Sequence, residues 1–487
     1  MVTWVAIGFA FAGVVFWALT GVGKWSNVPD YGDAAFSYYT TWAVAHGQFA
    51  CAYPPQHFAG LPVPDRPYSY IAPLYPLVAG ALSALLGLGA RAAFPTSLAM
   101  GPHCGNALAA MHSWAGITRV TTPTVELGFL MWIVLIAGYL STISLASYPL
   151  GRWELVGLGV VGLSFPLLDA MIHYFHPEDA LGLGLILLAI RPVVRRRWWV
   201  AGSVLGLAFV AHQLAVVVLV VVLVISPWQA KWRILAAFLL TVSAVVAPFI
   251  VLQDGGSWRN IIAGSSIPQG VRSTLVGELH LSIHTSGVIA RGAPILAAFA
   301  LAWVMRRRHA QLATLELTSL IIVTLGLRLV FEVNLFGYYF LALAVGLVIL
   351  EVMQRRFRGT VAAWLMLEAV VYSQFDIGAY SQGGTWAMFA VSIVPMFLAA
   401  AGVCVVLLQL SRHRIEWTWL AYLVIVSATM LIGMHSKSPI VMAGPLWLWQ
   451  VILVCSGLML ASEPLWRIRR VGEPAESSQV RDTSSVL

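Results

Sequence analysis

The sequence predicts an all-α fold, a polytopic transmembrane helical bundle of about 14 spans, some of them short, with an outer first loop that carries interfacial helices. Composition is the first reason, because the 487 residues are 60% hydrophobic and only 10% charged, with a mean hydropathy of +0.84. Soluble globular proteins are about 25% charged. Several apolar runs also exceed the roughly 18 residues that can cross a bilayer. The spacing of the basic residues is the third reason.

Basic residues recur in six clusters along the chain. These are Arg191 to Arg197, Lys231 with Arg233, Arg306 to Arg308, Arg355 to Arg358, Arg412 with Arg414, and Arg467 to Arg470. Cytoplasmic loops of membrane proteins are enriched in Lys and Arg, so we place all six clusters in the cytoplasm. The net charge of +8 then reflects topology rather than nucleic-acid binding.

Apolar segments lie between and before these clusters with lengths that suit spans. The expected spans include 2–22, 123–148, 154–172, 234–252, 288–305, 312–330, 337–353, 360–374, 386–410, 416–433 and 440–460. The segment 198–226 joins two cytoplasmic clusters and must therefore cross an even number of times. We predict two short helices that turn at Ala211, His212 and Gln213 on the outer side, since short hairpins are tolerated where a cavity enters the membrane.

The first third of the chain is predicted to be mostly outer loop. Val2 to Val22 lacks a clear small-residue cleavage site and is interpreted as an uncleaved first span. The loop 24–122 follows, in which 70–90 and 97–117 either both cross or neither crosses. Tyrosines and prolines before 76 favour an interfacial helix and the count of 14; if both segments cross, the count is 16.

The domain organisation is simple. We expect one integral membrane domain over 1–471, a disordered cytoplasmic tail over 472–487, and both termini in the cytoplasm. Cys51 and Cys104 lie outside if 70–117 does not cross, where a disulfide between them is possible.

Ionisable residues that topology does not explain collect on the predicted outer side. Such residues at membrane depth are costly and are candidates for function. No GxxxxGK[ST] motif occurs in the sequence, which argues against an ATP-driven transporter. We therefore expect chemistry on the outer face that uses no soluble nucleotide.

The first outer loop carries the most informative motif. Asp33 opens a predicted amphipathic helix with Phe36, Tyr39, Ala43 and Val44 on one side, and Gly47 stands where a C-terminal cap is expected. A carboxylate at this position caps free N–H groups and suits the helix dipole. Capping is compatible with catalysis, because it fixes the carboxylate in place.

This motif, followed by Tyr53-Pro54-Pro55 and Pro73-Leu74-Tyr75-Pro76, resembles the GT-C class of glycosyltransferases. The nearest likeness is to the actinobacterial polyprenyl-phosphomannose-dependent α-mannosyltransferases. The resemblance is strong over about 1–90 and weaker over 176–226, where His212 stands at a position that often carries Lys. The rest of the chain matches only as alternating spans.

The resemblance implies a bacterial plasma-membrane enzyme whose active site faces the periplasm or outer side. A sugar, mannose by resemblance, would move from a polyprenyl-phosphate donor to a lipid or glycan acceptor, with membrane lipids and no nucleic acid as further partners. Asp33 matches the general base of such enzymes and Asp30 is the alternate. The donor phosphate would be bound by Arg272, His280, His284 and Arg328, and substrate by Tyr38, Tyr39, His176, Glu178, His212, Gln213 and Glu332.

Two of these assignments have structural alternatives. Arg328 and Glu332 could form a simple i, i+4 ion pair. The run from His173 to Asp179 could ligate a divalent cation, but Pro177 interrupts the helix that would align its histidines. We expect Glu178 and Asp179 to cap the next helix, with acceptor binding as the alternative, and we assign no metal site. Mg²⁺ or Mn²⁺ stays open as a cofactor.

Two other functions compete with sugar transfer. A transporter or flippase for lipid-linked sugars would show inverted repeats and charges at the midplane, and neither is evident in the sequence. A non-catalytic assembly or polymerase-type membrane protein is the third class.

Overall fold

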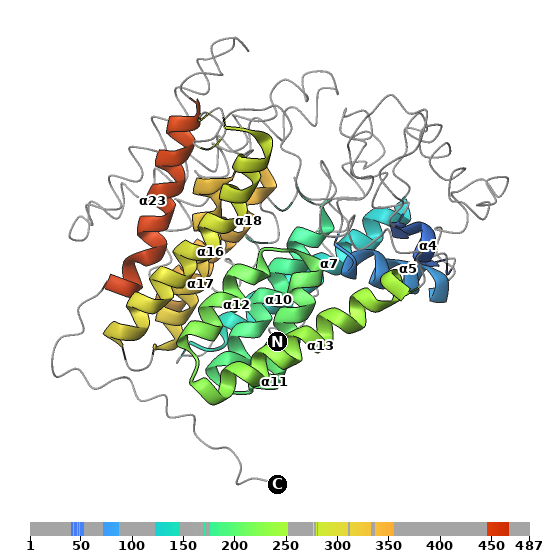
Figure 1. Cartoon of the computed structure of the whole chain (residues 1–487), viewed down its shortest axis with the longest axis horizontal. Coiled ribbons are helices and arrows are strands. Elements are labelled where there is room, and N and C mark those ends of the chain that lie inside the picture. Colours follow the sequence, from blue (N-terminus) through green and yellow to red (C-terminus); the bar gives the residue numbers. More distant parts are fainter. Residues whose placement is uncertain are drawn as a thin grey trace, which may run out of the picture.

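The computed structural model describes part of the chain, and this part is built from α-helices with no strand among them (Figure 1). The described residues are 40–41, 43–45, 47, 49–52, 72–86, 122–146, 161, 167, 170, 176–251, 276, 279, 281–309, 312–332, 337–354 and 446–466. The predicted all-helical class is confirmed for these residues.

Four consecutive helices form the centre of the described structure. They are α10 (Pro177–Val194), α11 (Trp198–Ala211), α12 (Ala215–Ile225) and α13 (Trp228–Val251). Short connections join them, so neighbours in sequence run in opposite directions. α10 packs on α7 (Thr122–Ile143) and on α11, and α11 packs along α13. The predicted hairpin of two short helices with His212 in its turn is confirmed.

A second group of helices lies beside the first (Figure 1). It contains α16 (Ile283–Arg308), α17 (Thr314–Phe331), the short 3-10 helix η2 (Gly337–Phe340), α18 (Leu341–Gln354) and α23 (Leu446–Trp466). α17 contacts α16, α18 and α23, and α12 joins the two groups by packing on α16 and α17.

Glycines allow the central helices to approach closely. A Cβ added at Gly206 of α11 would lie 2.9 Å from the carbonyl oxygen of Phe238 and from Cβ of Thr241, both in α13. A Cβ at Gly184 of α10 would lie 2.6 Å from the backbone nitrogen of Leu135 in α7. Small residues at such crossings are typical of helix packing in membranes, where close backbone approach supplies the contact energy.

Three helices are long and apolar enough to cross a membrane: α13, the segment Thr285–Arg308 of α16, and α17. Only 28% of the apolar window of α13 and 22% of that of α16 are buried within the structure, and Leu240, Leu296 and Phe299 are exposed. Water does not tolerate apolar faces of this size, so the described helices belong to a membrane protein.

The described part of the first loop packs on the central helices, since α5 contacts α10 and α11 and α4 contacts α13. Residues 40–45 are helical where described, and Gly47 ends the helix with φ +69° and an N–H bond to the Val44 carbonyl. The predicted glycine cap is therefore confirmed. Thr40 also donates a hydrogen bond to the Ala52 carbonyl in α4 (Phe49–Ala52). α5 (Leu74–Leu86) has 13 residues, about 20 Å of helix, which is too short for a hydrocarbon core about 30 Å thick.

Most predicted spans that fall on described residues coincide with helices. The segments 123–148, 234–252, 288–305, 312–330, 337–353 and 440–460 correspond to α7, α13, α16, α17, α18 and α23. The segments 2–22, 97–117, 360–374, 386–410 and 416–433, nearly all of 154–172, and the tail 472–487 lie outside the described residues. The count of 14 spans stays a prediction.

Candidate functional site

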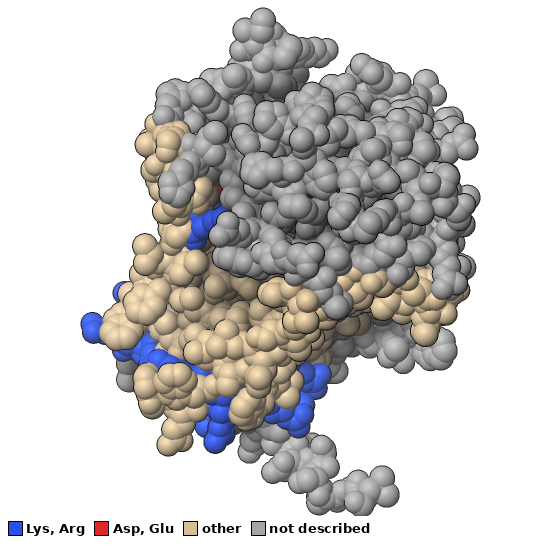
Figure 2. Space-filling view, turned by 45° about the vertical axis from the view of Figure 1, so that its right-hand side comes forward, with Lys and Arg blue, Asp and Glu red and all other residues tan. Residues whose placement is uncertain are grey.

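The helices of the described structure have two chemically different ends. At one, which we call the basic end, α10, α12 and α16 finish and α11, α13 and α17 begin. It carries Arg195, Arg196, Arg197, Lys231, Arg233, Arg306, Arg307 and Arg308, and Figure 2 shows most of the blue side chains along one edge. Arg306 donates to the Val224 carbonyl at the end of α12, and Arg308 lies 4.8 Å from the Trp466 ring of α23.

The opposite end, which we call the site end, gathers buried acidic, imidazole and phenol groups. Here α10, α12 and α18 begin and α11 and α17 finish. The helices themselves are apolar, so these polar groups meet where five helix termini converge. The candidate site has two parts, one on α10 and α11 and the other on α17 and η2.

The first part begins at the N-terminus of α10. Pro177 occupies the first turn, and Glu178 and Asp179 follow it, where the helix dipole favours carboxylates. Their predicted place in the first turn is confirmed, but their side chains contact other side chains. Glu178 Oε1 lies 2.7 Å from His176 Nδ1, and both side chains are largely buried. Among the described residues, Glu178 Oε2 is buried without a hydrogen-bond partner.

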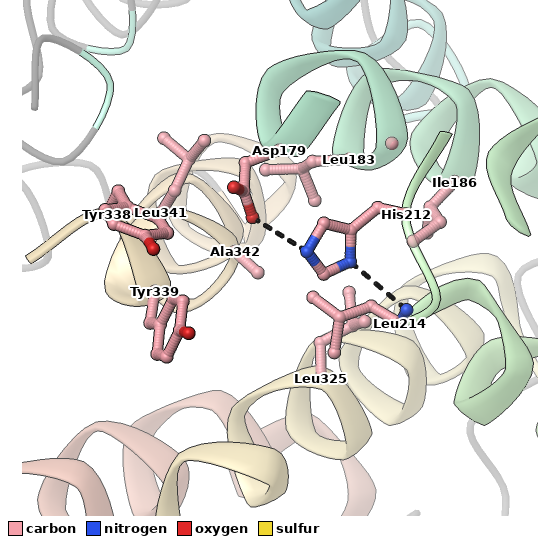
Figure 3. A pocket seen from close by; sticks show the side chains of 11 residues that line it. Asp179, Leu183, Ile186, His212, Leu214, Leu325, Tyr338, Tyr339, Leu341 and Ala342 are labelled. Carbon is pink, nitrogen blue, oxygen red and sulfur yellow. Dashed lines mark hydrogen bonds and ion pairs between the residues drawn. The ribbon is translucent and has the colours of Figure 1, made fainter. Parts of the chain in front are cut away.

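His212, in the turn between α11 and α12, joins this part through Asp179. Its Nε2 lies 3.1 Å from Asp179 Oδ1, and its Nδ1 accepts the N–H of Leu214 at 3.2 Å (Figure 3). The His212 ring is thus held from both sides, by the Leu214 N–H at Nδ1 and by the buried Asp179 carboxylate at Nε2.

A small cavity adjoins this pair. Its volume is about 20 Å³, against the roughly 10–15 Å³ that one water needs, and it is lined by Asp179, Gly182, Leu183, Ile186, His212, Leu214, Leu325, Tyr338, Tyr339, Leu341 and Ala342 (Figure 3). Such a space holds a water or an ion and is too small for a sugar. A sugar would have to approach the polar groups from outside this cavity.

The second part of the site is centred on Arg328 at the end of α17. Arg328 Nε donates to Glu332 Oε2 at 2.7 Å, which is the i, i+4 pair that the sequence suggested. The guanidinium also lies 4.6 Å from the ring of Tyr339. Arg328 and Glu332 are only 17% and 16% exposed, so the pair is shielded from bulk water and is stronger than a surface ion pair.

Tyr338 and Tyr339 connect the two parts. The Tyr338 ring stacks on His176 with centroids 4.5 Å apart and meets Tyr339 edge-on at 4.7 Å. The two rings thus extend from His176 of the first part to the Arg328 guanidinium of the second.

The first loop reaches this site through α5. Burial, and secondarily the carboxylate of Glu178, raises the pKa of Tyr75 at the start of α5, which places its ring near the α10 terminus. A Cβ added at Gly80 of α5 would lie 2.7 Å from Cβ of Val44, so the described part of the loop helix packs against α5. The described helical residues 40–45 are thus connected to the site by one intervening helix, α5.

The structure brings together five of the predicted site residues: His176, Glu178, His212, Arg328 and Glu332. Gln213 lies in the same turn as His212 but is not among the residues that line the cavity. Asp30, Asp33, Tyr38, Tyr39, Arg272, His280 and the side chain of His284 lie outside the described residues. Cys51 is described only as a helical position, and Cys104 lies outside, so the suggested disulfide stays a prediction.

The sequence suggested Asp179 mainly as a helix cap, with substrate or acceptor binding as the alternative, and did not assign Tyr338, Tyr339 or Tyr75 to the site. Tyr338 and Tyr339 follow Glu332 closely, so their proximity to a predicted residue was a usable signal. Tyr75 offered no comparable signal. One side-chain set could also hold a metal ion, since His176, Glu178 and Asp179 each present a ligand atom within 4.8 Å of the others.

No model of a known protein family matches this chain, and no curated protein sequence matches it either.

Proposed function

We propose that this protein is a membrane glycosyltransferase that moves a sugar from a polyprenyl-phosphate donor to a lipid or glycan acceptor on the outer face of the membrane. One observation carries the proposal: a buried arginine and a cluster of buried carboxylates and imidazoles meet at the end of the helix bundle opposite the arginine clusters. The positive-inside rule favours a cytoplasmic position for the arginine clusters, and this supports a site on the outer face.

Arg328 is the proposed ligand of the donor phosphate. Its Nε is held by Glu332 and its face lies over Tyr339, so the guanidinium is fixed in orientation. The two Nη groups carry four more N–H donors, which match the oxygens of a phosphate. A fixed cation there stabilises the negative charge that builds on the leaving phosphate as the glycosidic bond breaks.

The group on α10 and α11 is proposed to bind the sugar or the acceptor. Carboxylates and imidazoles can hydrogen-bond to sugar hydroxyls, and His176 and Tyr338 add a stacked aromatic surface beside them. The proton of the attacking hydroxyl would pass to a carboxylate within hydrogen-bond reach. Asp33 is the proposed base, with Asp30 as the alternate.

The chemistry of a polyprenyl-phosphate donor also supports sugar transfer, because such a donor needs no nucleotide. The bond from the sugar to a lipid phosphate already carries the energy of transfer, so the reaction needs no nucleotide. Neither the sequence nor the described residues present a phosphate-cradling loop of the kind that ATP-driven enzymes use.

A transfer assay with two matched carboxylate variants tests the proposal. Purified protein in detergent or nanodiscs receives radiolabelled polyprenyl-phosphomannose and extracted acceptor lipids, and labelled product is separated by thin-layer chromatography. We expect transfer by the wild type and by Asp30→Asn, and its loss in Asp33→Asn, because an amide cannot accept the hydroxyl proton. Unchanged transfer in Asp33→Asn would refute the base assignment. No transfer by the wild type from any polyprenyl-phosphate sugar would refute the proposed function.

A further inference from the structure

We propose that His176, Glu178 and Asp179 form a binding site for a divalent transition-metal ion, of which Mn²⁺ and Zn²⁺ suit the ligand set best. The three residues occupy the N-terminus of α10, beside the cavity of the candidate site. The assignment is separate from the proposed sugar transfer, because it concerns what the cluster binds and not which reaction follows.

The geometry brings one imidazole and two carboxylates to a common point. Their ligand atoms lie within 4.8 Å of one another, and two ligands of one ion with bonds of about 2.0–2.2 Å lie at most about 4.4 Å apart. Side-chain rotation would have to close the remaining separation before all three could contact one ion. Pro177, which appeared to separate these residues, starts the helix at a point that leaves His176, Glu178 and Asp179 on the same side of its terminus.

A buried and unsatisfied oxygen points to a missing ligand. Glu178 is only 4% exposed, and among the described residues its Oε2 has no hydrogen-bond partner. A buried carboxylate oxygen that has lost water and gained nothing in exchange is costly. A cation bound to Glu178 would supply the interaction that this oxygen lacks.

The donor set selects the kind of ion. Mg²⁺ and Ca²⁺ prefer oxygen ligands alone, whereas a nitrogen with two carboxylates suits Zn²⁺ or Mn²⁺. His212 Nε2 also lies 3.1 Å from Asp179 Oδ1. This contact would hold the Asp179 carboxylate in position for the ion, because the protein ligands of a metal are usually fixed by hydrogen bonds to a second residue. Three protein ligands leave coordination positions open for water or an oxyanion.

Metal analysis of the full-length protein tests the site directly. The chain is purified with a tag that contains no polyhistidine and without chelators, and its metal content is measured by inductively coupled plasma mass spectrometry. After removal of metal, MnCl₂ is titrated in and free Mn²⁺ is followed by electron paramagnetic resonance, with ZnCl₂ as competitor. We expect about one ion per chain and saturable binding of Mn²⁺ that Zn²⁺ displaces.

Variants locate the ion. Glu178→Gln and Asp179→Asn should each bind Mn²⁺ at least about tenfold more weakly, because loss of even an outer contact costs about 10- to 100-fold in affinity. Glu316→Gln is the matched control, since Glu316 is a buried carboxylate at the opposite end of the bundle, and it should bind as the wild type does. Size-exclusion profiles show which variants fold.

Two results would overturn the site. One is a wild-type protein with neither bound metal nor saturable Mn²⁺ or Zn²⁺ binding. The other is unchanged binding in the folded Glu178→Gln or Asp179→Asn variant. Sugar transfer is assayed in parallel, so an active enzyme without metal would refute this site alone, and a metal-binding protein without transfer would refute the proposed function alone.

Discussion

The two ends of the described helices carry arginines in opposite ways. At the basic end the arginines are numerous, mostly exposed and associated with backbone carbonyls or tryptophan faces, as Arg306, Arg307 and Arg308 are. At the site end Arg328 is buried, bonded to Glu332 and held over Tyr339. The arginines of the basic end thus share a surface, as positive-inside clusters do, whereas Arg328 has a defined partner and a defined direction.

Surface labelling gives the largest expected difference between the two ends, because the outcome is all or none. In a background without native cysteines, Leu281→Cys at the start of α16 should react fully with a membrane-impermeant maleimide on intact cells. Arg195→Cys at the basic end should react only after the cells are opened, since the arginine clusters are expected to be cytoplasmic. Both positions are exposed in the structure. Labelling of Arg195→Cys on intact cells would reverse the proposed orientation.

Removal of charge should affect activity at one end only. We expect Arg328→Gln to lower kcat of sugar transfer by about 100- to 1,000-fold, the usual effect of losing a preorganised charged donor to a developing anion. Arg307→Gln is the control, because Arg307 contacts only the Trp303 ring among the interactions found for it and should leave transfer unchanged. Steady-state transfer rates measure both. If the Arg328→Gln enzyme kept the wild-type kcat, Arg328 would have no role in sugar transfer, and its ion pair with Glu332 would be purely structural.

A methyl group added inside the site should cost stability, and the same change elsewhere should not. A Cβ at Gly182 would lie 2.6 Å from Cβ of His212, so Gly182→Ala should displace His212 and destabilise the protein by about 1–3 kcal/mol. Gly292→Ala adds the same atom where nothing lies within 4 Å and should be neutral or stabilising by up to about 1 kcal/mol, because Ala favours helix. The unfolding temperature in detergent at one heating rate compares them. Equal unfolding temperatures for Gly182→Ala and Gly292→Ala would mean that His212 can shift away from α10 without loss of stability.

The sequence predicted much of the helix organisation because membrane helices are recognisable as long runs of apolar residues. Length, hydropathy and arginine spacing placed α13, α16, α17 and α18, and parity alone required the hairpin of α11 and α12. The cap at Gly47 was also predictable, since a left-handed residue after a helical pattern favours glycine. The expected role of Glu178 and Asp179 was only half right, because they occupy the first turn of α10 while their side chains contact His176 and His212.

Residue types and their order along the chain were enough to predict an all-helical membrane protein, its apolar helices and the separation of the arginine clusters from other charged groups. These follow from the free energy of placing each residue in lipid or water, which depends on residue type and position along the chain. Only packing in three dimensions brings His212 to Asp179, Tyr338 onto His176 and Tyr75 near Glu178. Those contacts join residues far apart in the chain, and they form only because close packing at glycines such as Gly184 and Gly206 fixes how the helix ends converge.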